Sequence, residues 1–234
     1  MLTLALDTST STGSIALGGT PTGAGESTLE MALPVQAVRS ESVLPGIDRL
    51  VSSAGCLPTD ISRVVVASGP GSFTGVRVSA ALAKGIRAAL GAELHAWSSL
   101  AAIAVGSGGS GSVCAAIDAR RGQVYAAGYG IARNGDEIAG LEPLFGPVAE
   151  PFAITLGRLR PARTWTLAAE LPENLERSAR SAGVRRLEPE DRESTAVALL
   201  RLTASFPDAG RVADPTTREP DYVRASSAER EASR

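Results

Sequence analysis

The positions of apolar residues divide the chain into two kinds of segment. Short apolar runs rich in β-branched and aliphatic residues predict strands, and longer segments with an apolar residue every three or four positions predict helices. In the first half, strands are predicted at residues 2–7, 14–18, 28–33, 63–67 and 93–96. Helices are predicted over residues 42–54, 74–90 and 98–105. The first half therefore has the order β-β-β-α-β-α-β-α.

A similar pattern starts again after a segment of glycine and serine at residues 106–112. Leu4-Ala5-Leu6-Asp7 opens the first half, and Ala115-Ala116-Ile117-Asp118 opens the second. Further along the second half, we expect strands at 122–127, 137–144 and 164–168 and helices near 152–159 and 194–205. The charged tail from residue 208 contains Pro215 and Pro220 and is expected to be irregular.

Two similar halves predict an α/β protein with two related lobes and a cleft between them. The expected boundaries are an N-terminal lobe at 1–105, a flexible linker at 106–112 and a C-terminal lobe at 113–234. The alternative is a chance similarity between two apolar strands that each end in Asp.

The composition narrows the class of protein and the chemistry. The chain has 234 residues, of which 44% are hydrophobic and 21% charged, as in ordinary soluble globular proteins. Its net charge of -2 gives no support for binding nucleic acid unaided. His95 is the only histidine, which excludes metal motifs built on paired histidines. The two cysteines form no zinc or redox motif. With no leader or spanning segment in the sequence, we expect a cytoplasmic location.

The segment 69–75, Gly-Pro-Gly-Ser-Phe-Thr-Gly, connects a predicted strand to a predicted helix. Backbone N–H groups in such a turn can meet a phosphate. Asp7 ends the first strand and is followed by a run of hydroxyl residues, a pattern that can face a nucleotide and its Mg²⁺. Both turns together give a candidate nucleotide site whose residues are Asp7, Thr8, Ser9, Gly69, Gly71 and Ser72. The alternative is that the Asp and hydroxyl groups satisfy turn N–H groups and that the glycines only make a tight connection.

Asp118, Arg120 and Arg121 stand at the equivalent point of the second half. A kinase of this architecture needs a second hydroxyl-rich phosphate loop there. The arginines have the donors to bind an anion but lack that hydroxyl pattern, and solvated turn arginines are the alternative.

The predicted helix 74–90 carries two apolar stripes. We expect Val78, Leu82 and Ile86 to face the protein's own core and the small-residue stripe to face a partner. Together with the exposed side of the helix at 42–54, this predicts an interface formed by Leu44, Asp48, Val76, Arg77, Ala80, Ala83, Lys84 and Arg87. The alternative is a helix buried on both sides within its own domain.

The sequence also resembles the bacterial TsaB (YeaZ) family. The motifs that carry this resemblance are Leu4-Ala5-Leu6-Asp7-Thr8-Ser9, Gly69-Pro70-Gly71-Ser72-Phe73-Thr74-Gly75-Val76-Arg77, the segment from Ala116 to Tyr125, and Pro220-x-Tyr222-x-Arg224. The resemblance implies an actin/Hsp70/sugar-kinase type, ribonuclease H-like fold with two lobes. It also implies a part in adding threonylcarbamoyl to N6 of adenosine 37 in tRNA.

In that family TsaB is the non-catalytic partner, the homologue TsaD carries the metal and the transfer site, and TsaE supplies an ATPase. The resemblance therefore implies TsaD and TsaE as partners, tRNA contact only through the complex, no membrane partner, and no required cofactor or metal. A retained ancestral site predicts weak binding of Mg²⁺ with ATP or ADP. Homodimerisation without the partner and a small ATP-dependent phosphotransferase of the same fold are the alternatives.

Overall fold

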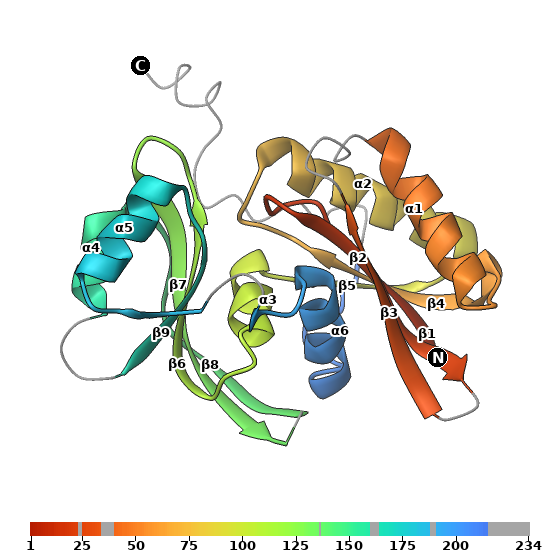
Figure 1. Cartoon of the computed structure of the whole chain (residues 1–234). Coiled ribbons are helices and arrows are strands. Elements are labelled where there is room, and N and C mark those ends of the chain that lie inside the picture. The colour runs from red at the N-terminus through yellow and green to blue at the C-terminus, as the bar shows by residue number, and fades with distance from the viewer. Residues whose placement is uncertain (23–24, 34–39, 136, 160–163, 188–190, 215–234) are drawn as a thin grey trace.

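The computed structural model describes residues 1–22, 25–33, 40–135, 137–159, 164–187 and 191–214. Its framework is two five-stranded sheets (Figure 1). The first sheet has the order β3-β2-β1-β4-β5. Its strands are β1 (Leu2–Asp7), β2 (Gly13–Thr22), β3 (Gly25–Leu33), β4 (Ile61–Ala67) and β5 (Glu93–Trp97).

The second sheet repeats this topology, with the order β10-β9-β6-β7-β8. Its strands are β6 (Gly111–Asp118), β7 (Gln123–Asn134), β8 (Glu137–Pro151), β9 (Trp165–Glu170) and β10 (Arg185–Arg186). In both sheets the first strand pairs antiparallel with the next strand in sequence and parallel with the fourth. The internal repeat predicted from the two Asp-terminated strands, and with it the two-lobed α/β fold, is therefore confirmed.

Helices cover the outer faces of both sheets. On the first sheet, α1 (Ser40–Ser53) packs against β2 and β3, and α2 (Phe73–Leu90) packs against β1, β4 and β5. On the second sheet, α4 (Phe152–Arg158) packs against β7 and β8, and α5 (Glu173–Ser181) packs against β10. A 3₁₀ turn, η2 (Pro58–Asp60), leads into β4.

Two further helices lie between the sheets (Figure 1). The first, α3 (Ser99–Gly106), follows β5 in sequence but packs against β6, β7 and β9 of the second sheet. The second, α6 (Thr195–Ser205), ends the second half but packs against β1, β2 and β4 of the first sheet. Every residue of α3 is buried. The two halves therefore share an apolar core around α3 and α6, and each half has a further core of its own beneath its outer helices.

The segment at 106–112 differs from the flexible linker that the sequence predicts. Helix α3 continues through Gly106, and β6 already begins at Gly111. The Arg133 Nη2 donates to the Val105 carbonyl at 2.6 Å, and the Glu193 N–H donates to the Gly106 carbonyl at 2.9 Å. These contacts fasten the start of the connection, and the flexibility of the whole segment stays a prediction. The lobe boundaries at 1–105 and 113–234 remain a prediction.

The chain after α6 returns to the first sheet. The Ala96 N–H donates to the Gly210 carbonyl at 2.8 Å, and the Val212 N–H donates to the Leu94 carbonyl at 2.9 Å. These bonds cover the free edge of β5, which would otherwise expose unpaired backbone groups. The predicted irregular tail is thus irregular but attached over 208–214, and residues 215–234, with the motif from Pro220 to Arg224, lie outside the described residues.

Candidate functional site

Acidic side chains stand at the carboxyl ends of parallel strands in both sheets. Asp7 is the last residue of β1, Asp118 the last of β6 and Glu170 the last of β9. Within the second sheet, Glu170 pairs in register with Ile117, next to Asp118. The carboxyl ends of parallel strands are where α/β proteins generally bind ligands. This end of the two sheets is the candidate site.

Asp7 is fully buried, and the turn that follows it satisfies its carboxylate. One oxygen, Oδ1, accepts from the Ser9 N–H at 2.8 Å and from the Ser9 hydroxyl at 2.6 Å. The other, Oδ2, accepts from the Thr10 hydroxyl at 2.5 Å. Burial raises the pKa of Asp7, the hydrogen bonds from Ser9 and Thr10 oppose this, and the charge of Glu170 adds to the rise. Both oxygens therefore already have donors within the turn.

The next two hydroxyl residues connect this turn to the rest of the fold. The Thr8 hydroxyl donates to the Gly75 carbonyl at 2.5 Å. The Ser9 and Ser99 hydroxyls share a hydrogen bond of 2.8 Å. The Ser72 N–H donates to the Ser9 carbonyl, also at 2.8 Å. The β1–β2 turn is thus tied both to the glycine-rich turn and to the start of α3.

The glycines at 71 and 75 allow the two turns to touch. A Cβ at Gly71 would overlap the Ser9 carbonyl oxygen, and one at Gly75 would overlap that of Thr8. Gly69 has φ +106°, a conformation that favours glycine. Ser72 caps α2, its hydroxyl accepting from the Gly75 N–H at 3.3 Å. The structure therefore brings all six candidate nucleotide residues together, with their polar groups directed largely at one another.

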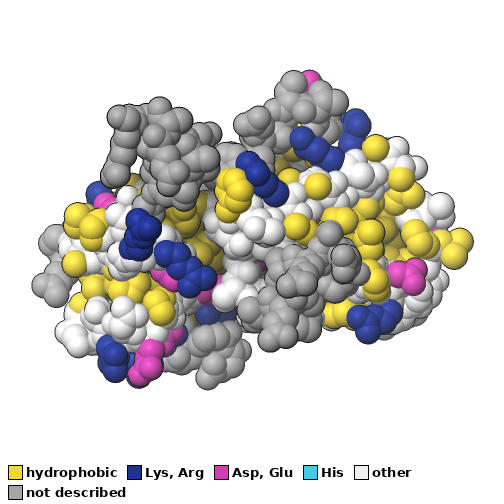
Figure 2. Space-filling model, turned by 90° about the horizontal axis from the view of Figure 1, so that it is seen from above, with side chains coloured by type: hydrophobic (Ala, Val, Ile, Leu, Met, Phe, Trp, Pro, Cys, Tyr) yellow, Lys and Arg dark blue, Asp and Glu magenta, His cyan; other side chains and the backbone are white. Residues whose placement is uncertain are grey.

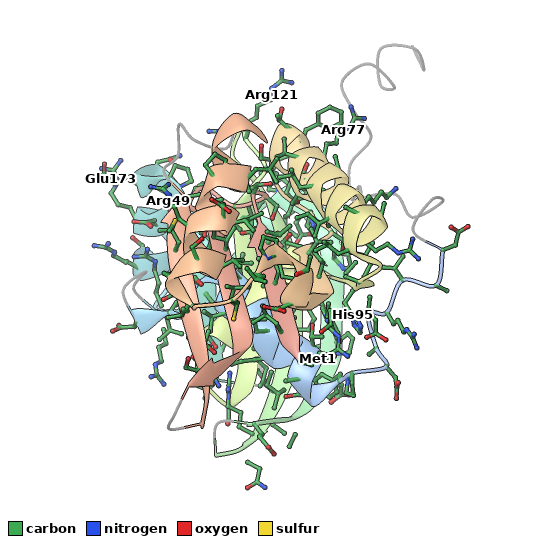
Figure 3. All side chains as sticks on the ribbon, turned by 90° about the vertical axis from the view of Figure 1, so that its right-hand side faces the viewer. Met1, Arg49, Arg77, His95, Arg121 and Glu173 are labelled. Carbon is green, nitrogen blue, oxygen red and sulfur yellow. The ribbon has the colours of Figure 1, made fainter. Side chains whose placement is uncertain are left out.

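The β6–β7 turn holds its arginines in a left-handed conformation. Arg120 has φ 68° and Arg121 has φ 57°. The Asp118 Oδ1 accepts from the Arg120 N–H at 2.8 Å, and its Oδ2 lies 3.5 Å from the Arg120 guanidinium. The Arg120 side chain is 88% exposed. Arg121 projects from the same end of the molecule as Arg77 of α2 (Figure 3). The turn therefore displays both arginines at this end of the molecule.

The predicted partner interface is wrong at two of its residues, which are buried. Val76 is only 3% exposed and Ala83 is 0% exposed, and Ala83 belongs to the core beneath α1 and α2. The reason is Ser79, a polar residue on the buried face of α2 whose hydroxyl donates to the Gly75 and Val76 carbonyls of its own helix. The buried stripe therefore runs through Val76, Ser79 and Ala83. Val78, Leu82 and Ile86, predicted to face the core, are half-buried and pack against it beside this stripe.

The other predicted interface residues remain accessible. Leu44 is 51% exposed, Asp48, Arg77 and Arg87 are exposed, and Ala80 and Lys84 are half-buried. The exposed positions of α2 also include small residues, among them Ala81, Gly85 and Ala88. Figure 2 shows hydrophobic side chains spread over the side of the molecule where α1 and α2 lie. This accessible side is called the α1–α2 face below, and its use as an interface stays a prediction.

An exposed aromatic ring stands at the start of α2. Phe73 is 46% exposed, and the Arg77 guanidinium lies 3.8 Å above its ring.

Within the described ranges, no group of three or more His, Cys, Asp or Glu side chains could hold a metal ion. Nor does any helix in those ranges have the length and apolar character needed to cross a membrane.

Comparison with known proteins assigns the chain to a family. A family model described as "TsaD: tRNA N6-adenosine threonylcarbamoyltransferase" matches residues 32–151. The chain is 38% identical over 132 residues to the tRNA threonylcarbamoyladenosine biosynthesis protein TsaB of Bacillus subtilis, a match that covers 55% of each protein. It is 42% identical over 101 residues to the Escherichia coli protein of the same name, covering 41% of this chain and 43% of that protein. The chain thus spans about half the length of the curated relatives it matches.

A solved structure resembles nearly the whole chain. It is described as an uncharacterized protein with similarity to peptidase YEAZ from Pseudomonas aeruginosa. The TM-score is 0.72 at 23% identity, and the match covers 95% of this chain and 99% of that one. Because the sequence identity is only 23%, this structural likeness establishes the fold and not the function.

Proposed function

Because the chain belongs to the TsaB (YeaZ) branch of the family described as TsaD, tRNA N6-adenosine threonylcarbamoyltransferase, we propose that it is a non-catalytic scaffold of tRNA threonylcarbamoyladenosine synthesis. In this role it supports the addition of threonylcarbamoyl to N6 of adenosine 37 by a catalytic homologue, TsaD.

The state of Asp7 carries the non-catalytic part of the proposal. A carboxylate that acts as a general base or holds Mg²⁺ needs an oxygen directed at substrate or metal. Both Asp7 oxygens instead accept hydrogen bonds from Ser9 and Thr10, and the side chain is 0% exposed. Gly71 and Gly75 place the glycine-rich turn directly against the backbone of Thr8 and Ser9. This arrangement favours a structural role for the strand ends over a phosphotransferase activity.

The proposed partner surface is the α1–α2 face. Small side chains at Ala81, Gly85 and Ala88 allow a partner helix to approach closely. On α1, Leu44 adds an exposed apolar side chain, and Arg77 and Arg87 of α2 supply exposed charges. Interfaces commonly have such an apolar centre with a polar edge. TsaD is the proposed occupant, and a second copy of the chain is expected there only when TsaD is absent.

The remaining partners follow from this role. TsaE is the proposed third component and supplies the ATPase, and tRNA contacts this chain only within the complex. Binding of Mg²⁺ with ATP or ADP to the chain alone is expected to be weak, since the Asp7 oxygens and the neighbouring hydroxyls already have partners. No cofactor is required of this chain.

A depletion experiment in cells tests the proposal. Removing the chain should lower the threonylcarbamoyladenosine content of bulk tRNA, measured by mass spectrometry of digested nucleosides, and a plasmid copy should restore it. Unchanged modification after verified loss of the protein would overturn the proposed role. Restoration by a plasmid copy that carries D7A, judged at equal protein level, would further support a role that needs no Asp7 chemistry.

A further inference from the structure

One carboxylate joins the two sheets at the candidate site. The Glu170 Oε2 accepts from the Ser11 N–H at 2.8 Å and from the Ser11 hydroxyl at 2.7 Å. Ser11 lies in the turn between β1 and β2 of the first sheet, and Glu170 ends β9 of the second. A charged acceptor that takes two short hydrogen bonds from one residue makes a stronger contact than a neutral pair does. The ends of the two sheets are therefore held together at this point.

The donors of Ser11 differ from those of its neighbours in the same turn. Thr8 donates to Gly75, while Ser9 and Thr10 donate to Asp7, so these hydroxyls are directed inward and are buried. Ser11 is exposed, and its N–H and hydroxyl point across to the other sheet. Ser11 thus offers two neighbouring donors, one from the main chain and one from its hydroxyl, and both are directed outward. A turn can bind an oxyanion with such a pair of donors.

The repeated topology explains why an acid stands opposite this turn. Strand β9 of the second sheet corresponds to β4 of the first, since each pairs parallel with the opening strand of its half. After β4 the chain forms the glycine-rich turn, whereas β9 ends in Glu170. The carboxylate therefore stands in the second half close to the position at which the glycine-rich turn follows its strand in the first.

We propose that Glu170 is a built-in anion that fills an oxyanion site formed by Ser11 and so latches the two sheets together. With Glu170 in place, its charge repels a second anion from this end of the fold. Without it, the two Ser11 donors become available to a phosphate group, whether free or carried by a nucleotide. This inference does not depend on pairing with TsaD.

Removal of the carboxylate tests the site directly. Calorimetric titration of the full chain with inorganic phosphate, and separately with ATP and Mg²⁺, should show about ten-fold tighter binding for E170A than for wild type. A gain for phosphate alone identifies free phosphate as the fitting ligand, and a gain for ATP alone identifies the nucleotide. The matched control is E173A, because Glu173 is an exposed acid three residues away whose side chain pairs with Arg177 of its own helix at 3.5 Å. No gain for either ligand, or an equal gain in E173A, would overturn the proposal.

One further variant and one further measurement keep the result interpretable. The double variant S11A/E170A should lose most of the gained affinity, because the hydroxyl donor is gone; full retention would mean that phosphate binds elsewhere and the assignment fails. Hydrogen exchange reports the latch itself. The Ser11 amide should exchange about ten-fold faster in E170A than in wild type, and an unchanged rate would show that the contact does not hold in solution. Circular dichroism of each variant confirms that it is folded.

Discussion

Gly75 of α2 packs its Cα against the main-chain carbonyl of Thr8, so closely that a Cβ at position 75 would overlap that oxygen. The Thr8 hydroxyl in turn donates to the Gly75 carbonyl at 2.5 Å. The relationship ties the start of α2 to the end of β1. It gives the glycine-rich motif a structural purpose that is independent of any ligand.

The first prediction concerns this glycine. G75A should lower the free energy of unfolding by about 3 kcal/mol, because the added methyl group forces backbone apart rather than a flexible side chain. Gly85 of the same helix is the matched control, since it is exposed and a Cβ there would meet nothing within 4 Å. G85A should therefore raise the free energy of unfolding by up to about 1 kcal/mol through helix propensity. Urea unfolding measures both, and equal effects of the two changes would contradict the packing described here.

A second prediction concerns the pH dependence that Asp7 introduces. Burial raises the pKa of Asp7 above its ordinary 3.8, so the folded chain holds this proton more tightly than the unfolded chain does. In the pH range between the ordinary pKa of 3.8 and the raised pKa, the free energy of unfolding of wild type falls as pH rises. D7N lacks this titration. The difference in free energy of unfolding, D7N minus wild type, should therefore increase with pH across that window and then level off. A difference that stays constant with pH would contradict a raised pKa of the buried Asp7 carboxyl.

His95 gives a pH dependence of the opposite sign. Its side chain is 0% exposed, and its Nε2 lies 3.7 Å from the Glu93 carboxylate. Burial first and the Arg63 charge second lower the pKa of His95 below 6.5, while Glu93 opposes the shift. The unfolded chain therefore takes up the proton first as pH falls, and stability is lost below about pH 6.5.

The measurement for His95 is urea unfolding of wild type and H95F from about pH 8 down to about pH 5. Wild type should lose stability across this range more steeply than H95F, which has no titrating ring. Parallel pH profiles for the two proteins would show that His95 does not titrate differently in the folded and unfolded states.

The α1–α2 face is tested by two alanines that stand two positions apart. Ala83 is 0% exposed, whereas Ala81 is exposed on the same helix. A83E buries an unpaired charge and should cost about 4 kcal/mol of folding stability or prevent folding. A81E should fold as wild type does but bind TsaD at least about ten-fold more weakly. Calorimetry with purified TsaD measures the pairing, and unchanged affinity of folded A81E would remove this face from the interface.

The sequence predicted the fold better than it predicted the site. Strand β1 was predicted with its observed bounds, because a short apolar run bounded by Asp and hydroxyl residues has few alternatives. Helix α5 was missed, since only Leu175 and Ala179 of its residues are buried and the rest of the helix is polar. The predicted strand at 164–168 stopped two residues short of Glu170. The acid that meets Ser11 was therefore left out of the candidate site.

The error on α2 has a definite physical cause. Sequence periodicity places polar residues outside, but a serine on a helix can satisfy its hydroxyl on the preceding turn and be buried at little cost. Ser79 does this, so the buried stripe is displaced from the one that apolar residues alone suggest. No pattern in the sequence shows that Glu170 and Ser11 meet, because they are brought together only when the two sheets pack around α3 and α6. Of these residues, only Glu170 carried a usable signal in the sequence, namely its position at the end of an apolar run.

The central claim is that this chain supports threonylcarbamoyl transfer without performing it. The most direct measurement reconstitutes the reaction from purified TsaD, TsaE, threonylcarbamoyl donor, ATP and unmodified tRNA, with and without this chain, and quantifies threonylcarbamoyladenosine by mass spectrometry. The account predicts modification only when the chain and TsaD are both present, and none from the chain alone. Modification by the chain without TsaD, or full activity of TsaD and TsaE without the chain, would contradict it.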